Sequence, residues 1–547
     1  MRRKAGVLLS VSSLPSREGI GTLGEGAYAF VDFLAAAGFR VWQVLPLTPT
    51  REGNSPYSSV CENALNPLFI DAYDLLRLGL LSEDEIPPAS GERVDYASFI
   101  PQKDRLLRLA FSRFDRKDPD FVAFEKKGEY RDYAVFSTLS EVNGDKPFYE
   151  WADGYDRYDE SRVHDFIREH FELYLYHVFT QYIFDVEWKR LKEYANAHGI
   201  EIFGDMPIYV AMNSAEVYFH PEMFLFDEDR HPKKVAGVPP DYFNSEGQLW
   251  GNPLYDWERM SRNDYAWWRE RIRRELNRFD ILRIDHFRGL DRFYAIDADA
   301  ADAKHGTWTK GPGAALFDGL VDLPIVAEDL GYIDESLREM LQKVGFPGMK
   351  VYEFGLDADP WSEHKPANYA ENVVAYTGTH DNMPFCGYLD AISREEKGTA
   401  AKTILIQATV LGVPIAAADH LKGALRIEDA DGARVLQELT APYPADLAAH
   451  KEEMHRRVMA IEGLKDTAFA ELDSLTLTEI AFETLLRSRA CLAMVPMQDL
   501  LALGADSRMN TPALVSEENW AWRLNAAYLK KDRIARLREK LQAAERL

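Results

Sequence analysis

The chain has 547 residues and 46% of them are hydrophobic, so it can bury a large core. At roughly 150 residues per domain, a chain of this length could contain three or four domains. A single barrel of about 250 residues with long insertions fits the length equally well. The formal net charge of -25 argues against partners such as nucleic acid or anionic membranes, because both require a basic protein surface. A neutral substrate is compatible with this charge.

The cysteines and the start of the chain bear on where the protein works. Cys61, Cys386 and Cys491 are scattered and show no C-x-x-C spacing, which indicates neither a disulfide framework nor a zinc site and predicts a cytoplasmic location. The basic start followed by apolar residues 5–11 resembles part of a signal peptide, but no cleavage site follows, and we interpret it as the first strand. No apolar run reaches the ~18 residues that would span a membrane.

In the first half of the chain, short apolar runs alternate with helical patterns. Residues 6–11 and 41–47 read as two parallel strands joined by a helix, and residues 200–210 read as a third strand. Between the second and third strands, about 50–185, we expect a helical subdomain inserted into the fold. Residues 211–256 are rich in Pro, Gly and aromatic residues, and we expect them to form a long functional loop.

The second half supplies five more apolar runs. The fourth strand starts at residue 281 and ends near Asp285, and the others cover residues 323–331, 349–354, 372–381 and 491–499, with a helical subdomain expected at about 382–490. The pattern predicts an α/β fold, a (β/α)8 TIM barrel, as a single catalytic domain over residues 1–547. Large, mainly helical insertions are expected after strands 2, 3 and 7, and no C-terminal β-sandwich domain is expected.

Four carboxylates, Asp205, Asp285, Glu328 and Asp381, lie at the C-terminal ends of the third, fourth, fifth and seventh predicted strands. In a barrel these ends converge on one mouth, where catalytic groups lie. Each motif also has a structural interpretation. Asp285 after Arg283 fits a buried salt bridge, Glu328 fits a helix N-terminus, and His380 with Asp381 fits a turn or half of a metal site.

The same residues fit retaining glycoside transfer, which needs one ionised and one protonated carboxyl group about 5 to 5.5 Å apart. Arg283 and Arg288 flank Asp285 and would keep it ionised as the nucleophile. Glu328 follows two apolar residues, so burial and nearby negative charge would hold its proton. His380 and Asp381 would hydrogen-bond the sugar hydroxyls.

A metal-dependent barrel hydrolase is the main rival for such a collection of Asp and His residues. The first strand, however, carries no His-x-His pair and ends at Ser12 and Ser13. We therefore expect no metal and no organic cofactor, because the two carboxyl groups suffice for the chemistry.

Several motifs together resemble the 4-α-glucanotransferases, or amylomaltases, which form glycoside hydrolase family 77 in the α-amylase clan. They are Asn-Ser-Pro-Tyr-Ser-Ser at 54–59, Gly-Asp-Met-Pro-Ile-Tyr-Val at 204–210, Gly-Val-Pro-Pro-Asp-Tyr-Phe at 237–243, Leu-Trp-Gly-Asn-Pro at 249–253, Arg-Ile-Asp-His-Phe-Arg-Gly at 283–289, Ala-Glu-Asp-Leu-Gly at 327–331 and Thr-His-Asp-Asn at 379–382. Their order and spacing make the resemblance specific, and it covers residues 5 to about 525.

The resemblance implies transfer of α-1,4-glucan segments, with maltooligosaccharides and other α-1,4-glucans as partners, through a covalent glucosyl-enzyme. Asp285 matches the nucleophile, Glu328 the acid and base, and Asp381 the carboxylate that stabilises the transition state. The matching substrate-binding residues are Tyr57, Asp205, Asp241, Trp250, Asn252, Arg283, His286, Phe354, His380 and Asn510. Residues 241–250 match the loop that overhangs the acceptor side, and Trp250 would offer a stacking face.

This chain departs from the family pattern at three places. Asn213 stands where the family usually has an aspartate, and Ala513-Leu514 replace the expected Gly-Thr. Residues 405–475 form a longer segment than expected and contain an acidic run at 428–431, which fits a solvated face, an extra helical subdomain or a dimer contact. The alternatives to a transferase are a hydrolase-leaning amylase and a non-catalytic glucan-binding scaffold; retention of all three catalytic carboxylates argues against the scaffold.

Overall fold

The computed structural model describes residues 3–51, 53–88, 91–240, 246–331, 333–413, 433, 437–438 and 451–547. Within this part of the chain, no helix is long and apolar enough to cross a membrane.

An eight-stranded parallel sheet forms the centre of the molecule, in the order β10-β11-β12-β1-β2-β3-β6-β9. Its strands are β1 (Lys4–Leu8), β2 (Val41–Gln43), β3 (Glu201–Met206), β6 (Ile281–Ile284), β9 (Ile325–Ala327), β10 (Gly348–Val351), β11 (Val373–Tyr376) and β12 (Leu492–Pro496). The first and last strands of the order approach each other, and the Ala327 N–H donates a hydrogen bond to the Pro347 carbonyl at 2.9 Å. The sheet is therefore the predicted (β/α)8 barrel.

All eight predicted strands are present, but several end earlier than predicted. β1 stops at Leu8 and continues as a 3-10 turn over Val11–Ser13, and β2 stops at Gln43 rather than at residue 47. The apolar residues beyond these ends are still buried, but the chain is leaving the barrel there. A hydrophobic run in the sequence shows where a buried strand lies but not where it ends, because the loop that follows the strand is buried too.

The barrel interior is a packed core. Six of the strands contribute to one buried cluster, which consists of Val41, Phe203, Val326, Met349, Val351, Val374, Tyr376, Leu492 and Met494. The Tyr376 hydroxyl lies in this core and donates a hydrogen bond to Oε1 of Gln43 at 2.9 Å. The chemistry must therefore take place at the mouth of the barrel.

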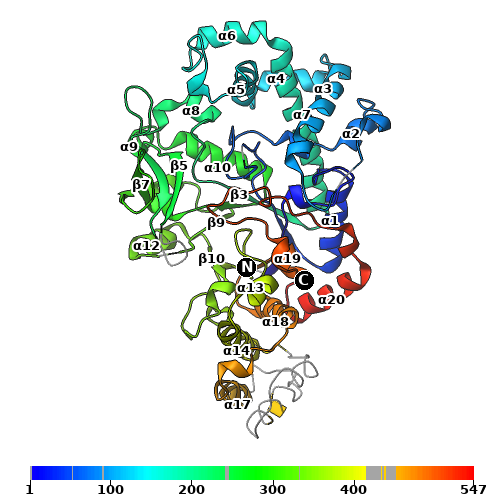
Figure 1. The fold of residues 1–547 in the computed structure, drawn as a ribbon, viewed down its shortest axis with the longest axis vertical. Helices are drawn as coiled ribbons and strands as arrows, with labels where there is room; N and C mark the ends of the chain where they lie inside the picture. The colour runs from blue at the N-terminus through cyan, green and yellow to red at the C-terminus, as the bar shows by residue number, and fades with distance from the viewer. Residues whose placement is uncertain are drawn as a thin grey trace.

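Helices fill the connection between β2 and β3. They are α2 (Ala72–Arg77), α3 (Tyr96–Arg113), α4 (Pro119–Lys127), α5 (Arg131–Val142), α6 (Glu160–Glu169) and α7 (Phe171–Ala197), and they gather at the upper end of the molecule in Figure 1. The 27-residue α7 packs against α5 and leads directly into β3.

A second, antiparallel sheet stands beside the barrel, with strand order β5-β4-β7-β8. It contains β4 (Lys234–Val238), β5 (Gln248–Pro253), β7 (Arg292–Asp297) and β8 (Gly306–Lys310). The prediction that residues 211–256 form a loop was wrong in this respect, since they contain α8 (Ala215–Phe219) as well as two strands. Two segments far apart in the chain complete one sheet here, which a pattern read along the sequence does not reveal.

The remaining connections are helical. They contain α1 (Glu25–Ala37), α9 (Trp257–Ser261), α10 (Ala266–Arg278), α11 (Arg288–Asp291), α12 (Glu335–Val344), α13 (Phe385–Ala391), α14 (Arg394–Val410), α17 (Lys451–Glu462) and α18 (Ser474–Arg487). The last four share a hydrophobic cluster separate from the main core, at the lower end of Figure 1. The predicted acidic run at 428–431 lies outside the described residues.

The two ends of the chain meet on the barrel. After β12 the chain forms α19 (Met497–Leu500), short turns and α20 (Lys531–Ala543), which packs against α1. β12 pairs with β1 over five residues. The guanidinium of Arg546 donates hydrogen bonds to the carbonyls of Lys4, Leu486, Ser488 and Ala490, so the last residues fasten both strands. No β-sandwich follows the barrel in residues 497–547.

Candidate active site

The four carboxylates singled out in the sequence lie at the C-terminal ends of barrel strands. Asp205 lies at the C-terminal end of β3, and Asp285 and Glu328 directly follow β6 and β9. Asp381 comes five residues after β11. Neighbouring parallel strands deliver their ends to the same mouth, so β3, β6 and β9, which are adjacent in the sheet, bring three of these groups together.

Arg283 links two of the carboxylates. Its Nη1 donates to both oxygens of Asp205 at 2.7 and 2.8 Å, and its Nη2 lies 2.7 Å from Oδ1 of Asp285. The guanidinium is 5% exposed, and these two carboxylates raise its pKa well above the ordinary value against the effect of burial. A permanently charged group therefore lies against Asp285, favours the ionised carboxylate and fixes its orientation.

Glu328 is held by two backbone N–H groups. Oε2 accepts from the His286 N–H and Oε1 from the Leu330 N–H, both at 2.8 Å. The pKa of Glu328 is raised to about 7, because burial and the charge of Asp285 together outweigh the opposite effect of Arg283. Glu328 can therefore hold a proton near neutral pH beside an ionised Asp285, which is the division of roles that a retaining mechanism needs.

His286 and Trp250 meet at the side of the site formed by the small antiparallel sheet. His286 adopts a left-handed backbone conformation with φ 47°, which turns its N–H toward Glu328. Burial lowers the pKa of its imidazole to about 4, so the ring is neutral. Trp250, on β5, packs edge to face on that ring at 4.9 Å and remains 37% exposed. An aromatic face is thus available beside the acid and base.

Tyr57 and His380 form a second aromatic pair at the site. Their rings stack with centroids 5.1 Å apart and 13° between planes, and Trp520 packs against both at 6.0 Å. The Tyr57 hydroxyl donates to Oδ2 of Asp205 at 2.7 Å. Two distant segments of the chain, the loop after β2 and the loop after β11, are joined in this way at the mouth.

Asp381 is oriented by amide and guanidinium groups rather than by an ion pair of its carboxylate with an arginine. Asn510 Nδ2 donates to Asp381 Oδ1 at 2.7 Å, and Arg508 Nη2 donates to the Asp381 main-chain carbonyl at 2.7 Å. His380 Nε2 lies 3.5 Å from the same Oδ1. The carboxylate side chain remains 46% exposed, so it can reach a bound sugar.

Two of the other predicted residues, Asn252 and Phe354, have partners outside the group of carboxylates. Asn252 on β5 uses its amide to donate to the Val210 carbonyl at 2.9 Å, which ties the small sheet to the loop after β3. Phe354 follows β10, packs against the barrel core and contacts His364 edge to face at 5.5 Å. Asp241 lies outside the described residues.

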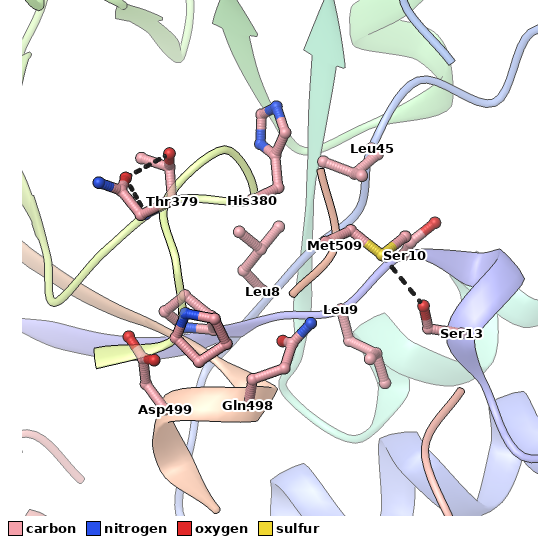
Figure 2. Close-up of a pocket in the computed structure, with 13 residues that line it drawn as sticks. Leu8, Leu9, Ser10, Ser13, Leu45, Thr379, His380, Gln498, Asp499 and Met509 are labelled. Atoms are coloured by element: carbon pink, nitrogen blue, oxygen red, sulfur yellow. Dashed lines mark hydrogen bonds between the residues drawn. The ribbon is translucent and has the colours of Figure 1, made fainter. Parts of the chain in front are cut away.

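A cavity lies beside His380, between the ends of β1, β2, β11 and β12. Ser10, His380, Gln498, Asp499 and Met509 line it together with apolar side chains. Figure 2 shows Thr379 and His380 on one loop above Gln498 and Asp499, which come from α19. Asp499 binds the loop from below, because its oxygens accept from the Thr377 hydroxyl at 2.6 Å and the Phe385 N–H at 2.7 Å.

Three residues near the catalytic groups were missed in the sequence analysis: Glu353, Arg508 and Trp520. Glu353 follows β10 as the other carboxylates follow their strands, and that position was a usable signal. Arg508 and Trp520 flank the Asn510 motif but lie over 100 residues from the groups they contact, and only the folded chain shows these contacts. In the described part of the chain, no group of three or more His, Cys, Asp or Glu residues is arranged to hold a metal ion.

The chain is similar to known proteins over nearly all of its length. A family model described as 4-alpha-glucanotransferase matches residues 9–529. The chain is 36% identical over 539 residues to the 4-alpha-glucanotransferase of Aquifex aeolicus, covering 97% of each chain, and 37% identical over 558 residues to that of Thermus thermophilus, covering 100% and 99%. The structure is similar to an amylomaltase from Streptococcus agalactiae in complex with acarbose, with a TM-score of 0.83, 36% identity and full coverage of both chains.

Proposed function

Since this chain belongs to the 4-alpha-glucanotransferase family, glycoside hydrolase family 77, and is an enzyme that transfers glucan segments, we propose that Asp285, Glu328 and Asp381 perform this transfer by a retaining double displacement. The observation that carries the assignment is the pairing of a carboxylate held by Arg283 with a neighbouring carboxyl group whose pKa is raised to about 7.

In the first step, an oxygen of Asp285 attacks the anomeric carbon of the donor glucan. The bond between that carbon and the glycosidic oxygen breaks, and Glu328 gives its proton to the departing oxygen. The product is a glucosyl ester of Asp285 and a shortened glucan. Arg283 supports this step, because it holds the attacking carboxylate in one orientation and keeps it ionised.

In the second step, Glu328 acts as a base. Formation of the ester removes the negative charge of Asp285, and that charge is one of the causes of the raised pKa of Glu328. The pKa of Glu328 therefore falls in the intermediate. Glu328 then takes the proton of an acceptor 4-hydroxyl, whose oxygen attacks the anomeric carbon and releases Asp285. The acid of one step thus becomes the base of the next.

The remaining groups bind the sugar as it flattens toward an oxocarbenium ion. We assign Asp381 and His380 to the sugar hydroxyls and Tyr57 to an aromatic platform for the donor ring. Asp381 remains 46% exposed next to the stacked pair of Tyr57 and His380, which supports this assignment. Hydrogen bonds that strengthen in the transition state raise kcat more than they lower KM.

Transfer instead of hydrolysis requires that a sugar reach the intermediate before water does. We assign residues 211–256 to an acceptor-side cover, of which Trp250 is the exposed aromatic face beside His286 and Glu328. A sugar stacked there would be held close to the ester, and proximity of this kind favours the sugar over bulk water. The acceptors and donors are α-1,4-glucans and maltooligosaccharides. The free Cys61, Cys386 and Cys491 support a cytoplasmic location.

Pure maltotriose tests the proposal. Incubated with the enzyme and a chelator, it should give glucose together with a ladder of longer maltooligosaccharides, because each transfer shortens one chain and lengthens another. Accumulation of maltose and glucose alone would indicate a hydrolase and would contradict the role of Trp250. Activity lost to the chelator and restored by a divalent metal would contradict the two-carboxylate mechanism.

A further inference from the structure

Glu353 is a buried carboxyl group at the barrel mouth that the mechanism above does not use. It lies two residues after β10, in the 3-10 turn Tyr352–Gly355. Its N–H donates to the Thr377 carbonyl at 3.1 Å, just beyond β11, so it stands next to the start of the loop that carries His380 and Asp381. In the described part of the chain, its Oε2 is buried without a hydrogen-bond partner.

A continuous set of hydrogen bonds connects Glu353 to that loop. Asn382 Nδ2 donates to Glu353 Oε1 at 2.9 Å. Asn382 Oδ1 in turn accepts from both the N–H and the hydroxyl of Thr379, at 2.9 and 2.8 Å, which are the dashed lines at Thr379 in Figure 2. The Thr379 hydroxyl oxygen finally accepts from the Asp381 N–H at 3.3 Å.

These contacts are mutually consistent and leave the Asn382 amide a single orientation. Its oxygen is occupied by two donors from Thr379, so its NH2 group must face Glu353, which has to supply an acceptor. Glu353 therefore stands at the outer end of a network whose inner end is the backbone of Asp381. Removing Glu353 would leave a partly buried amide donor without its acceptor and free the Asn382 side chain to rotate.

The charged surroundings show which form of Glu353 fills this role. The pKa of Glu353 is raised to about 8, because burial together with the charge of Asp499 from α19 outweighs the hydrogen bond from Asn382 and the charge of Arg508, which both lower it. At neutral pH the side chain is therefore a neutral acid. A neutral acid presents one carbonyl acceptor to Asn382, as the amide of a glutamine would.

We propose that Glu353 is a positioning residue for glucan transfer: through Asn382 and Thr379 it fixes the turn that carries His380 and Asp381. The proposal rests on the assigned role of Asp381 in that transfer. Glu353 itself contacts neither the sugar nor Asp285. Because Asp381 acts most strongly on the distorted sugar, a loosened turn should lower kcat while KM for maltotriose changes little.

The experiment compares Glu353→Ala, Glu353→Gln, Asn382→Ala and the double variant Glu353→Ala/Asn382→Ala, with kcat and KM for maltotriose and a thermal unfolding curve for each. Glu187→Ala is the matched control. Glu187 on α7 is also buried, accepts one backbone N–H through Oε2 and has an Oε1 without a partner in the described residues, but it lies among the helices of the inserted region. It should lower the unfolding temperature and leave kcat unchanged.

We expect kcat of Glu353→Ala to fall about tenfold or more, as for the loss of a buried hydrogen bond in the transition state, with KM within about twofold. Glu353→Gln should keep kcat within about twofold of wild type, and the double variant should be no slower than the slower single variant, because both changes break one network.

Three results would overturn the proposal: an unchanged kcat in Glu353→Ala, a Glu353→Gln variant as slow as Glu353→Ala, or effects of Glu353→Ala and Asn382→Ala that multiply in the double variant. If Glu353→Ala fails to fold, the other two single variants still test the proposal. The proposal requires a low kcat in Asn382→Ala and a kcat near that of the wild type in Glu353→Gln. A wild-type enzyme that makes no ladder from maltotriose would instead contradict the proposed function.

Discussion

The two sides of the active site hold their carboxylates by different means. On the side of β3 and β6, Arg283 lies between Asp205 and Asp285, so three charged groups are in contact, of which Arg283 and Asp205 are buried. On the side of β10 and β11, the Asp381 carboxylate is oriented through amide groups, with Asn510 on the carboxylate and Asn382 beneath its turn, and Arg508 contacts only the main-chain carbonyl of Asp381. Glu353, which supports Asn382, carries its own proton at neutral pH.

The difference follows from what each carboxylate must do. A nucleophile must carry a negative charge and a fixed orientation in the free enzyme, and the permanently charged Arg283 in contact with Asp285 suits both. A carboxylate that binds a sugar in its distorted form needs accuracy of position, which neutral hydrogen bonds supply without drawing its charge away from the substrate. We therefore expect changes on the charged side to cost more activity than changes on the neutral side.

The largest effect is expected for Asp285→Asn. The amide cannot form the ester, so kcat for maltotriose should fall by at least about 10⁴-fold, as for other enzymes that lose their nucleophile. Asp297→Asn, which removes an exposed carboxylate paired with Lys234, serves as the control and should keep full activity. Substantial residual transfer in pure Asp285→Asn, measured by the product ladder, would assign the nucleophile elsewhere.

Glu328→Gln should lower kcat by about 10² to 10⁴-fold, the usual contribution of a general acid and base. The pH profile gives a sharper test. Burial raises the pKa of Glu328 to about 7, so the protonated acid persists up to that pH and is lost above it. For the wild type, kcat/KM should therefore decline as pH rises through about 7. A decline centred near 4.5, the ordinary value, would show that Glu328 is not the acid.

Arg283→Lys retains the positive charge but not the planar fork that reaches both Asp205 and Asp285. We expect kcat to fall about 100-fold, because the ammonium group cannot fix both carboxylates at once. Arg278→Lys is the matched control, since Arg278 is another buried arginine, paired with Glu275 outside the mouth. Equal kcat in Arg283→Lys and Arg278→Lys would mean that a positive charge at residue 283 is sufficient. The contrast between the two sides of the active site would then have no basis.

Asn510→Ala should have the smallest effect of the four. It removes one hydrogen bond of 2.7 Å to Asp381, and a loss of about 1 kcal/mol corresponds to a fall in kcat of roughly fivefold. Asn525→Ala, which removes an asparagine that caps a surface turn, should leave kcat unchanged. A fall as large as that of Arg283→Lys would show that the neutral side is no more tolerant than the charged side.

The sequence predicted the barrel because its strands are buried on both faces and therefore appear as short, nearly continuous apolar runs. It did not predict the small antiparallel sheet. β8 reads Gly-Thr-Trp-Thr-Lys and is largely exposed, so it lacks an apolar run, and β4 lies in a segment rich in Pro and Gly. Exposed strands of this kind are defined by their partners more than by their own composition.

Part of the candidate site was also predicted from the apolar runs that mark the barrel strands. Asp205, Asp285 and Glu328 directly end or follow predicted strands, so the barrel alone brings them together. The prediction that both Arg283 and Arg288 flank the nucleophile was less informative. The structure gives Arg283 that position, whereas Arg288 pairs with Asp334 at 3.0 Å and lies over the Trp308 ring. Adjacency in the chain does not determine which of two arginines faces a carboxylate.

The pairing of β1 with β12 has a consequence for how the chain is made. Among the barrel strands β1 is made first, and the strand that covers one of its edges, β12 at Leu492–Pro496, is made last. Until β12 has been made, that edge of β1 has no partner within the barrel, and unpaired edges promote aggregation. The barrel therefore closes only once β12 has been made, and the nascent chain must be protected while the strands between them are synthesised.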